Sequence, residues 1–219
     1  MFKINTRIVK QKALQIIEKY QDIEKFLPYC KECDNYHSKW SCPPLSFNPR
    51  EYLEKYKNIY IISCQVNYDL ETINSLQTPD EIATFSKRVL RKIKNQIGTN
   101  LLEIEKRYDN TISISAGACS YCCKCSRKEN QPCKKPEKMR YSLDSFGVDL
   151  TRISQDLFDI KILWGSEKLP EYHVLLLGLA TNADIEEAEI LSILGTENMT
   201  SVEFTSHKTM QSKYHKNSV

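Results

Sequence analysis

Residues 173–181 read HVLLLGLAT, a run that is apolar at almost every position. A strand buried on both faces has this continuous apolar pattern, so the run predicts a central strand of a sheet. Two further runs have strand character, IYIISCQVNY at 59–68 and TISISAG at 111–117, and a shorter strand is expected at 160–164. The sequence therefore predicts a small sheet built around residues 173–181.

An amphipathic helix is predicted near the N-terminus, over residues 6 to about 25. Its apolar residues recur at helical spacing, and Thr6 is the expected cap. We expect this helix to end before Pro28, because proline disrupts the interior of a helix.

Two later helices have start signals in which a cap residue is followed by proline and then by glutamate. Asn48 and Pro49 begin the second helix, and Thr78 and Pro79 begin a third, longer one. The long helix lies between two predicted strands, an order that fits a right-handed crossover joining parallel strands. We therefore expect an α/β or α+β fold: a small sheet with a β-α-β crossover, flanking helices and cysteine-rich metal-binding loops.

Length and composition predict one cytoplasmic metal-binding domain. A chain of 219 residues can form a single core, which we place at 1–204, with cysteine-rich loops near 28–48 (the first loop) and 117–141 (the second loop) and a loosely ordered polar tail at 205–219. The formal charge of +3 comes from 31 basic and 28 acidic residues, a mixture that does not favour nucleic acid as a partner. The sequence also lacks an apolar segment of about 20 residues that would predict a membrane span, and a secretory signal.

Eight of the nine cysteines lie in the two loops, at spacings typical of metal ligands. Disulfide frameworks, by contrast, belong mainly to short secreted chains. In the second loop Cys119, Cys122 and Cys125 follow at two-residue gaps and Cys133 comes later in PCKKP, which is close to the ferredoxin pattern. Three evenly spaced cysteines favour a [4Fe–4S] cluster over zinc, which usually takes paired ligands from two turns, and zinc is the alternative metal.

The first loop contains a second group of cysteines in YCKECDNYHSKWSCPP. Cys30, Cys33 and Cys42 supply three thiols, and Pro43 and Pro44 make the segment after Cys42 extended and stiff. These features indicate a rigid metal-binding loop. The alternative is an apolar turn in which the cysteines pack as small hydrophobic residues.

Together the loop motifs CKEC, WSCPP, AGACSYCCKC and PCKKP, with YSLDSFGVDL after them, resemble the predicted metal-binding proteins of domain-of-unknown-function family 2284. The resemblance spans about residues 28–181. It differs from the family pattern at Ala118 and Tyr141, where proline is expected, and at Asp144, where glutamate is expected. The resemblance implies seven cysteine ligands, which are Cys30, Cys33, Cys42, Cys119, Cys122, Cys125 and Cys133.

Seven cysteines exceed the four ligands of one cluster and are one short of the eight ligands of two. Either a second cluster has three thiolates and an open iron, or another residue completes it. His37, Cys64 and Cys123 are the candidates for that ligand, each with an ordinary structural role as its alternative. A crossed arrangement, in which one cysteine run supplies a ligand to the other cluster, also stays open.

Basic residues gather around the second loop. Positive charge there would raise the potential of a cluster, or dock an acidic redox partner protein or a small anionic substrate, and the alternative is a solvated loop surface. These residues are Lys124, Arg127, Lys128, Lys134, Lys135, Lys138 and Arg140. Just after them, Ser142, Asp144 and Ser145 predict the start of a short helix, either as a plain cap or as a site where backbone N–H groups face sulfur or an anion.

Three functions fit this pattern. The first is electron transfer by an iron–sulfur protein with two [4Fe–4S] clusters, serving a partner enzyme of anaerobic metabolism. The second is an enzyme that removes sulfur or performs another reductive step at an open, three-cysteine iron site. The third is a structural zinc protein. Nucleophile elbow, phosphate-loop and Rossmann motifs are missing from the sequence, so hydrolase, kinase and nicotinamide-enzyme functions lack support.

Overall fold

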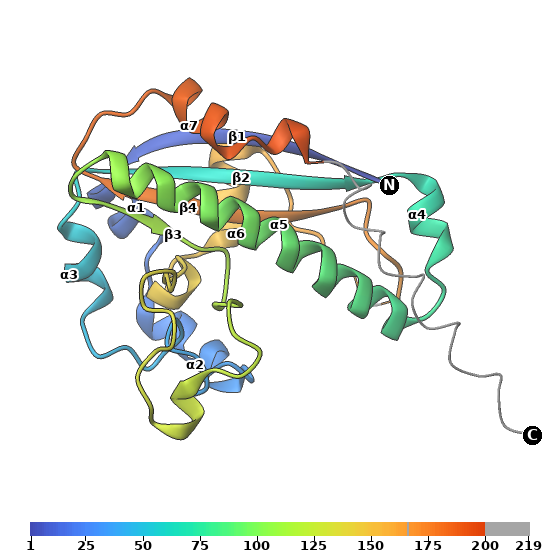
Figure 1. The fold of residues 1–219 in the computed structure, drawn as a ribbon, viewed down its shortest axis with the longest axis horizontal. Helices are drawn as coiled ribbons and strands as arrows, with labels where there is room; N and C mark the ends of the chain where they lie inside the picture. The colour runs from blue at the N-terminus through green and yellow to red at the C-terminus, as the bar shows by residue number, and fades with distance from the viewer. Residues whose placement is uncertain (166, 200–219) are drawn as a thin grey trace, which may run out of the picture.

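Antiparallel pairing joins four strands into one sheet in the order β1-β2-β4-β3 (Figure 1). The computed structural model describes residues 1–165 and 167–199. The strands are β1 (Phe2–Lys12), β2 (Asn58–Tyr68), β3 (Thr111–Ile114) and β4 (Tyr172–Thr181). Because β4 lies between β2 and β3, the prediction that residues 173–181 form a central strand is confirmed.

Helices pack on both faces of the sheet. The α-helices are α1 (Ala13–Tyr20), α2 (Ile23–Glu32), α3 (Pro49–Glu54), α4 (Leu70–Ser75), α5 (Pro79–Arg107), α6 (Leu150–Phe158) and α7 (Glu187–Leu194). Three short 3-10 helices are η1 (Ser126–Glu129), η2 (Asp144–Phe146) and η3 (Thr196–Asn198). Helices α5 and α7 share one apolar core with the sheet, and α1 and α6 share a second core on the opposite face.

Strand β2 shows how the two cores follow from the sequence. Tyr60, Ile62 and Cys64 belong to the core beneath α5, whereas Ile59 and Ile61 belong to the core beneath α1 and α6. All five side chains are fully buried. Successive side chains of a strand point to opposite faces, so a strand covered on both faces is apolar at nearly every position.

The prediction of a helix over residues 6–25 is wrong in its first half. Residues 2–12 form strand β1, paired with β2, and Thr6 lies within this strand instead of capping a helix. The helix α1 begins only at Ala13, after Lys12. Phe2 and Ile4 alternate with exposed polar residues, a pattern that indicates a strand. The helical spacing begins only after this segment.

Pro28 lies inside α2, so the prediction that a helix ends before it is also wrong. The chain breaks earlier, where Gln21 forms a β-bridge with Val148, and α2 starts anew behind Asp22. The Asp22 carboxylate accepts a hydrogen bond from the backbone N–H of Lys25. Because α2 starts at Ile23, Pro28 is only the sixth residue of this helix, and its missing N–H removes a single backbone donor.

The predicted β-α-β crossover joining parallel strands is not shown as a parallel strand pair within residues 1–165 and 167–199. β2 and β3 run in the same direction, but each pairs antiparallel with β4, which separates them. The described part of segment 160–164 contains no strand. The fold is mixed α/β, and the long helix α5 connects β2 to β3 across the sheet instead of joining adjacent strands.

The two later helix starts are confirmed. Asn48 caps α3 with Pro49 in its first turn, and Thr78 and Glu81 form a capping box at the start of α5. None of the helices within residues 1–165 and 167–199 combines the length and the apolar character needed to cross a membrane. The expected tail at 205–219 lies outside the described residues.

Candidate metal centre

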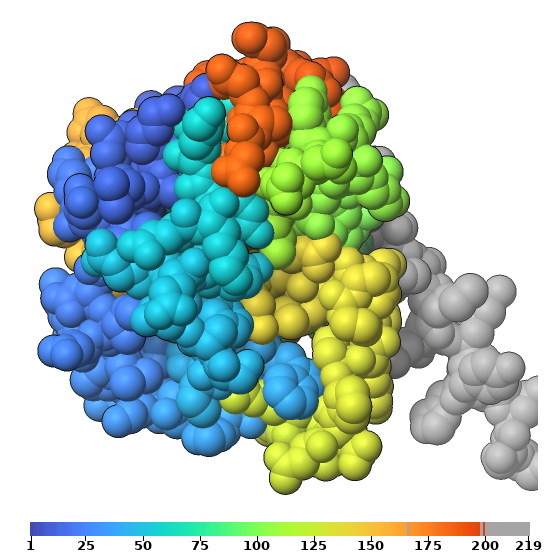
Figure 2. Space-filling view, turned by 90° about the vertical axis from the view of Figure 1, so that its left-hand side faces the viewer, coloured from blue at the N-terminus to red at the C-terminus, as the bar shows by residue number. Residues whose placement is uncertain are grey.

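The two cysteine-rich loops lie together below the sheet (Figure 1). The first loop follows helix α2, whose last turn contains Cys30, and the second follows strand β3. Figure 2 shows the light-blue first loop beside the yellow-green second loop at the lower end of the molecule. All nine cysteines have free thiols. Segments more than 75 residues apart in sequence therefore bring their thiols to one region.

Four cysteines of the second loop line a single small cavity. They are the four that the sequence predicts as ligands in this loop, namely Cys119, Cys122, Cys125 and Cys133. Lys39 and Trp40 of the first loop close part of the same cavity. The structure thus brings together thiols that span 15 positions of the chain, 119 to 133.

Helix α5 fixes the start of the second loop through side-chain hydrogen bonds to its backbone. The Lys94 ammonium donates to the carbonyl of Ala118 (2.6 Å), and the Arg91 guanidinium donates to that of Ser120 (3.0 Å). The Ser120 hydroxyl in turn donates to the side-chain amide oxygen of Asn95 (2.7 Å). Burial lowers the pKa of Lys94, although the nearby Cys119 raises it. The cysteines from Cys119 onward therefore start from an anchored position.

The three cysteines of the first loop are also neighbours. Cys33 ends α2 and donates its N–H to the Cys30 carbonyl, and the Cys42 N–H donates to the Lys39 carbonyl. Burial raises the pKa of Cys42 to about 11, and the charges of Asp144, Cys33 and Cys30 contribute in the same direction. Coulombic interactions weaken with distance, so these contributions indicate that Cys30 and Cys33 lie near Cys42.

Arg127 of the second loop holds the first loop in place. Its guanidinium donates hydrogen bonds to the carbonyls of Lys39 (2.6 Å), Cys42 (2.5 Å) and Pro44 (2.6 Å), and lies 5.2 Å from the ring centre of Trp40. One side chain thus satisfies three carbonyls of the first loop, as the planar fork of arginine allows. The two cysteine loops therefore form one structural unit.

Ser41 provides a second connection between the loops. Its hydroxyl oxygen accepts a hydrogen bond from the Cys119 N–H (2.8 Å) and lies 3.9 Å from the sulfur of Cys42. Ser41 is fully buried. One side chain thus contacts a predicted ligand from each loop.

A family model described as "Predicted metal-binding protein (DUF2284)" matches residues 16–177, which include both loops and all seven predicted ligands. The chain belongs to this family. No curated protein and no solved structure matches it. The family resemblance predicted from the loop motifs is confirmed, and with it the description of this DUF2284 protein as a predicted metal-binding protein.

The donor set fits the metal groups that thiolates bind. Four thiols bordering one cavity fit an iron–sulfur cluster, whose irons are held by cysteine thiolates. Among residues 1–165 and 167–199, no three or more histidine, cysteine, aspartate or glutamate side chains meet the geometry for holding a single metal ion.

The three candidates for an eighth ligand lie in different places in this DUF2284 protein. Cys64 is fully buried in the sheet beneath Thr6, and burial raises its pKa to about 12. Cys123 is exposed and lines a larger basic cavity together with Cys119. His37 is exposed, with its ring edge-on to Tyr36. Cys64 therefore packs in the core.

The basic residues of the second loop divide into two groups. Arg127 and Arg140 are half-buried, and Arg140 forms an ion pair with Glu105 of α5, whose Oε2 lies 2.5 Å from its Nη2. Five lysines are exposed and form a basic surface, which we call the lysine rim: Lys124, Lys128, Lys134, Lys135 and Lys138. Lys135 also donates to the carbonyl of Tyr121 (3.0 Å). Arginine in this segment is thus structural, and lysine supplies the surface charge.

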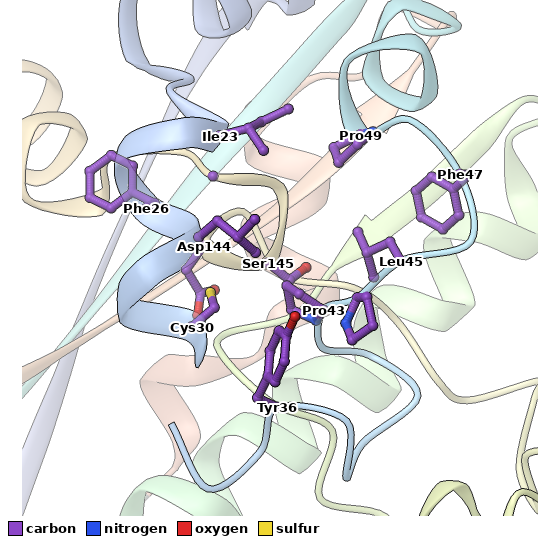
Figure 3. A pocket seen from close by; sticks show the side chains of 13 residues that line it. Ile23, Phe26, Cys30, Tyr36, Pro43, Leu45, Phe47, Pro49, Asp144 and Ser145 are labelled. Carbon is purple, nitrogen blue, oxygen red and sulfur yellow. The ribbon is translucent and has the colours of Figure 1, made fainter. Parts of the chain in front are cut away.

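The segment after the last cysteine forms the short helix that the sequence predicts, at η2. Its cap is Leu143, which makes no side-chain hydrogen bond, so Ser142 does not cap it. The Ser145 hydroxyl instead donates to the Ser142 carbonyl (2.6 Å). Asp144 begins η2 and lines, with Cys30, a mainly apolar cavity beside the first loop (Figure 3).

Proposed function

We propose that this DUF2284 protein binds two [4Fe–4S] clusters, one at each cysteine loop, and transfers single electrons to a partner protein in the cytoplasm. The arrangement of Cys119, Cys122, Cys125 and Cys133 around one cavity is the observation that supports this most strongly. Thiolates at these spacings are the ligands of cubane clusters. Bound clusters would supply one-electron redox chemistry, and free thiols are the usual state of cytoplasmic cysteines.

The residues around the second loop would raise the reduction potential of a cluster bound there. Arg91 and Lys94 of α5 bring positive charge to the start of the second loop, where Lys94 is half-buried. Positive charge beside a cluster stabilises the reduced, more negative state and therefore raises its potential. The lysine rim would then orient an acidic redox partner through long-range attraction.

The test is metal analysis of protein purified without oxygen. We expect a brown protein with iron and acid-labile sulfide, at up to eight irons per chain. The triple variant Cys30→Ala, Cys33→Ala, Cys42→Ala should keep roughly half of the iron, because the second loop assembles with its own ligands. Colourless protein with stoichiometric zinc would overturn the proposal, and full iron in the triple variant would remove the first loop from the metal site.

A second function, reductive catalysis at an open iron, is favoured by the cavity beside the first loop. Ile23, Phe26 and Leu45 give it apolar walls, and Cys30 opens onto it, so a small substrate could approach a metal held there. Candidate substrates should then change the electron paramagnetic resonance (EPR) spectrum of the reduced protein, since only an open iron takes a new ligand. An unchanged spectrum would leave electron transfer as the function.

A further inference from the structure

Asp144 places a carboxylate beside the cysteines of the first loop. Asp144 and Cys30 line the same cavity, and their side chains lie next to each other in Figure 3. After burial, the Asp144 charge is the largest cause that raises the pKa of Cys30, and it also raises that of Cys42. A negative group therefore lies beside a thiol that must become negative to bind metal.

The backbone holds Asp144 in this position. The N–H of Asp22, which caps α2, donates to the carbonyl of Gly147, which ends η2 (2.8 Å). Gly147 has φ of 74°, and a Cβ there would lie 2.7 Å from the Cα of Ile23. Only glycine permits this close approach of η2 to α2. Asp144, three residues before Gly147, is thereby fixed against the helix that bears Cys30.

The Asp144 carboxylate has no hydrogen bond or ion pair within the described part of the chain. Asp144 is exposed, and a carboxylate beside a ligand thiolate is electrostatically favourable only where a positive centre lies between them. The predicted ligands number seven, one short of the eight that two clusters take, and Asp144 is a carboxylate beside one of them.

We infer that Asp144 is the fourth protein ligand of the first-loop cluster, together with Cys30, Cys33 and Cys42. The inference rests on the proposed iron–sulfur function. Asp144 is better placed for this role than the three candidates from the sequence. Cys64 is in the sheet core, Cys123 is exposed and lines the basic cavity with Cys119, and His37, unlike Asp144, does not line the cavity that Cys30 borders.

Ligand chemistry makes this role measurable. A carboxylate is a harder ligand than a thiolate and holds a cluster iron less firmly. Ferricyanide should therefore take one electron from the first cluster and release the iron at Asp144 as Fe²⁺, converting [4Fe–4S]²⁺ to [3Fe–4S]⁺. The second cluster, with four cysteines, should resist the same treatment.

The experiment titrates ferricyanide into anaerobically purified full-length protein and follows released iron and the EPR signal of the three-iron cluster. Wild type should release about one iron per chain and give the signal. Asp144→Cys should release none and stay silent, because a thiolate now holds that iron. Asp34→Asn, an exposed carboxylate of the first loop, is the matched control and should behave as wild type.

A second variant guards against misfolding. Asp144→Asn keeps the shape of the side chain but weakens the ligand, so it should lose the iron with less oxidant than wild type. In the background without Cys30, Cys33 and Cys42, the oxidant-labile iron should be absent. Iron-loaded Asp144→Cys and Asp144→Asn proteins that both match wild type would overturn the role of Asp144. Wild type without any iron would instead overturn the iron–sulfur proposal and this inference together.

Discussion

Arg127 connects the two cysteine loops through three hydrogen bonds to carbonyls of the first loop, which include those of Lys39 and Cys42. A hydrogen bond from a charged group contributes about 1.5–3 kcal/mol, and its loss leaves a polar group unsatisfied. At the scale of a single residue, the shape of the metal region thus depends on a side chain that is not itself a predicted ligand.

Arg127→Gln should lower the free energy of unfolding by about 2–4 kcal/mol, because glutamine cannot reach three carbonyls. The neighbouring Lys128→Gln is the control, since Lys128 is exposed. Thermal and chemical denaturation of both variants measure the difference. Equal stability of the two variants would show that the guanidinium contacts are not needed.

Cys122 and Cys123 are adjacent and offer a matched pair for testing the ligand set. Cys122 lines the cysteine cavity of the second loop, whereas Cys123 does not. Cys122→Ser should lower the iron content by about half and reduce the melting temperature, since metal binding contributes to folding. Cys123→Ser should keep the full iron content. Iron analysis of the two variants is the measurement. Iron loss in Cys123→Ser but not in Cys122→Ser would make Cys123 the ligand instead of Cys122.

The ligand candidates of the second loop were predictable because metal-binding cysteines follow a local spacing, which the sequence displays directly. Contacts between distant segments could not be predicted in this way. The partners of Arg127 lie 83 to 88 positions away, and Asp144 approaches Cys30 only through the packing of η2 on α2. For this reason the sequence pattern placed Arg127 on a surface rim, and suggested Cys64 but not Asp144 as an eighth ligand.

At the scale of elements, helix α5 supports the second loop along much of its length. Its contacts with the loop run from Arg91 to Gly98, where the hydroxyl of Tyr121 approaches the helix backbone. A Cβ at Gly98 would lie 2.7 Å from that hydroxyl oxygen and 3.9 Å from the adjacent ring carbon. Gly98 therefore leaves room for Tyr121, which lies between two predicted ligands.

The effect of Gly98→Ala on the melting temperature should change sign when the residue at position 121 is changed. Alanine in a helix is favoured over glycine by about 1 kcal/mol, but here it displaces the Tyr121 hydroxyl and with it the loop. We expect Gly98→Ala alone to lower the melting temperature and Gly98→Ala in a Tyr121→Phe background to raise it. The double-mutant cycle measures this coupling. Additive effects would mean that the tyrosine moves aside without cost.

The start of α5 was predictable because a capping box is a short, local signal. The N-terminal strand could not be predicted, because Val9 by chance extends the helical spacing of Ala13 and the residues after it toward the N-terminus. Sheet order is set by long-range pairing: β4, distant in sequence, separates β2 from β3. A strand, helix, strand order therefore could not establish which strands are neighbours.

At the scale of the whole molecule, His173 makes stability depend on pH. Burial lowers the pKa of His173 below its ordinary value of about 6.5, and its Nδ1 lies 2.9 Å from the Tyr68 hydroxyl oxygen. The unfolded chain therefore binds a proton at a pH where the folded chain does not. Its contribution to stability is present above about pH 6.5 and is lost as the pH falls.

His173→Gln should remove this dependence. Between pH 7.5 and 5.5 the melting temperature of wild type should fall more steeply than that of the variant, because glutamine takes up no proton. Replacing the exposed His37 by glutamine is the control and should leave the slope unchanged. Parallel curves for wild type and His173→Gln would show that the folded histidine titrates normally.

Ser41 has a consequence for the rate of electron movement inside the molecule. Electrons tunnel more efficiently through bonds than across empty gaps. From the Cys42 sulfur, the route through the Ser41 hydroxyl to the Cys119 backbone consists of one 3.9 Å contact and one 2.8 Å hydrogen bond. Two clusters joined by so short a path would equilibrate faster than a partner protein could dock or leave. If both proposed clusters bind, the molecule would then act as a two-electron store.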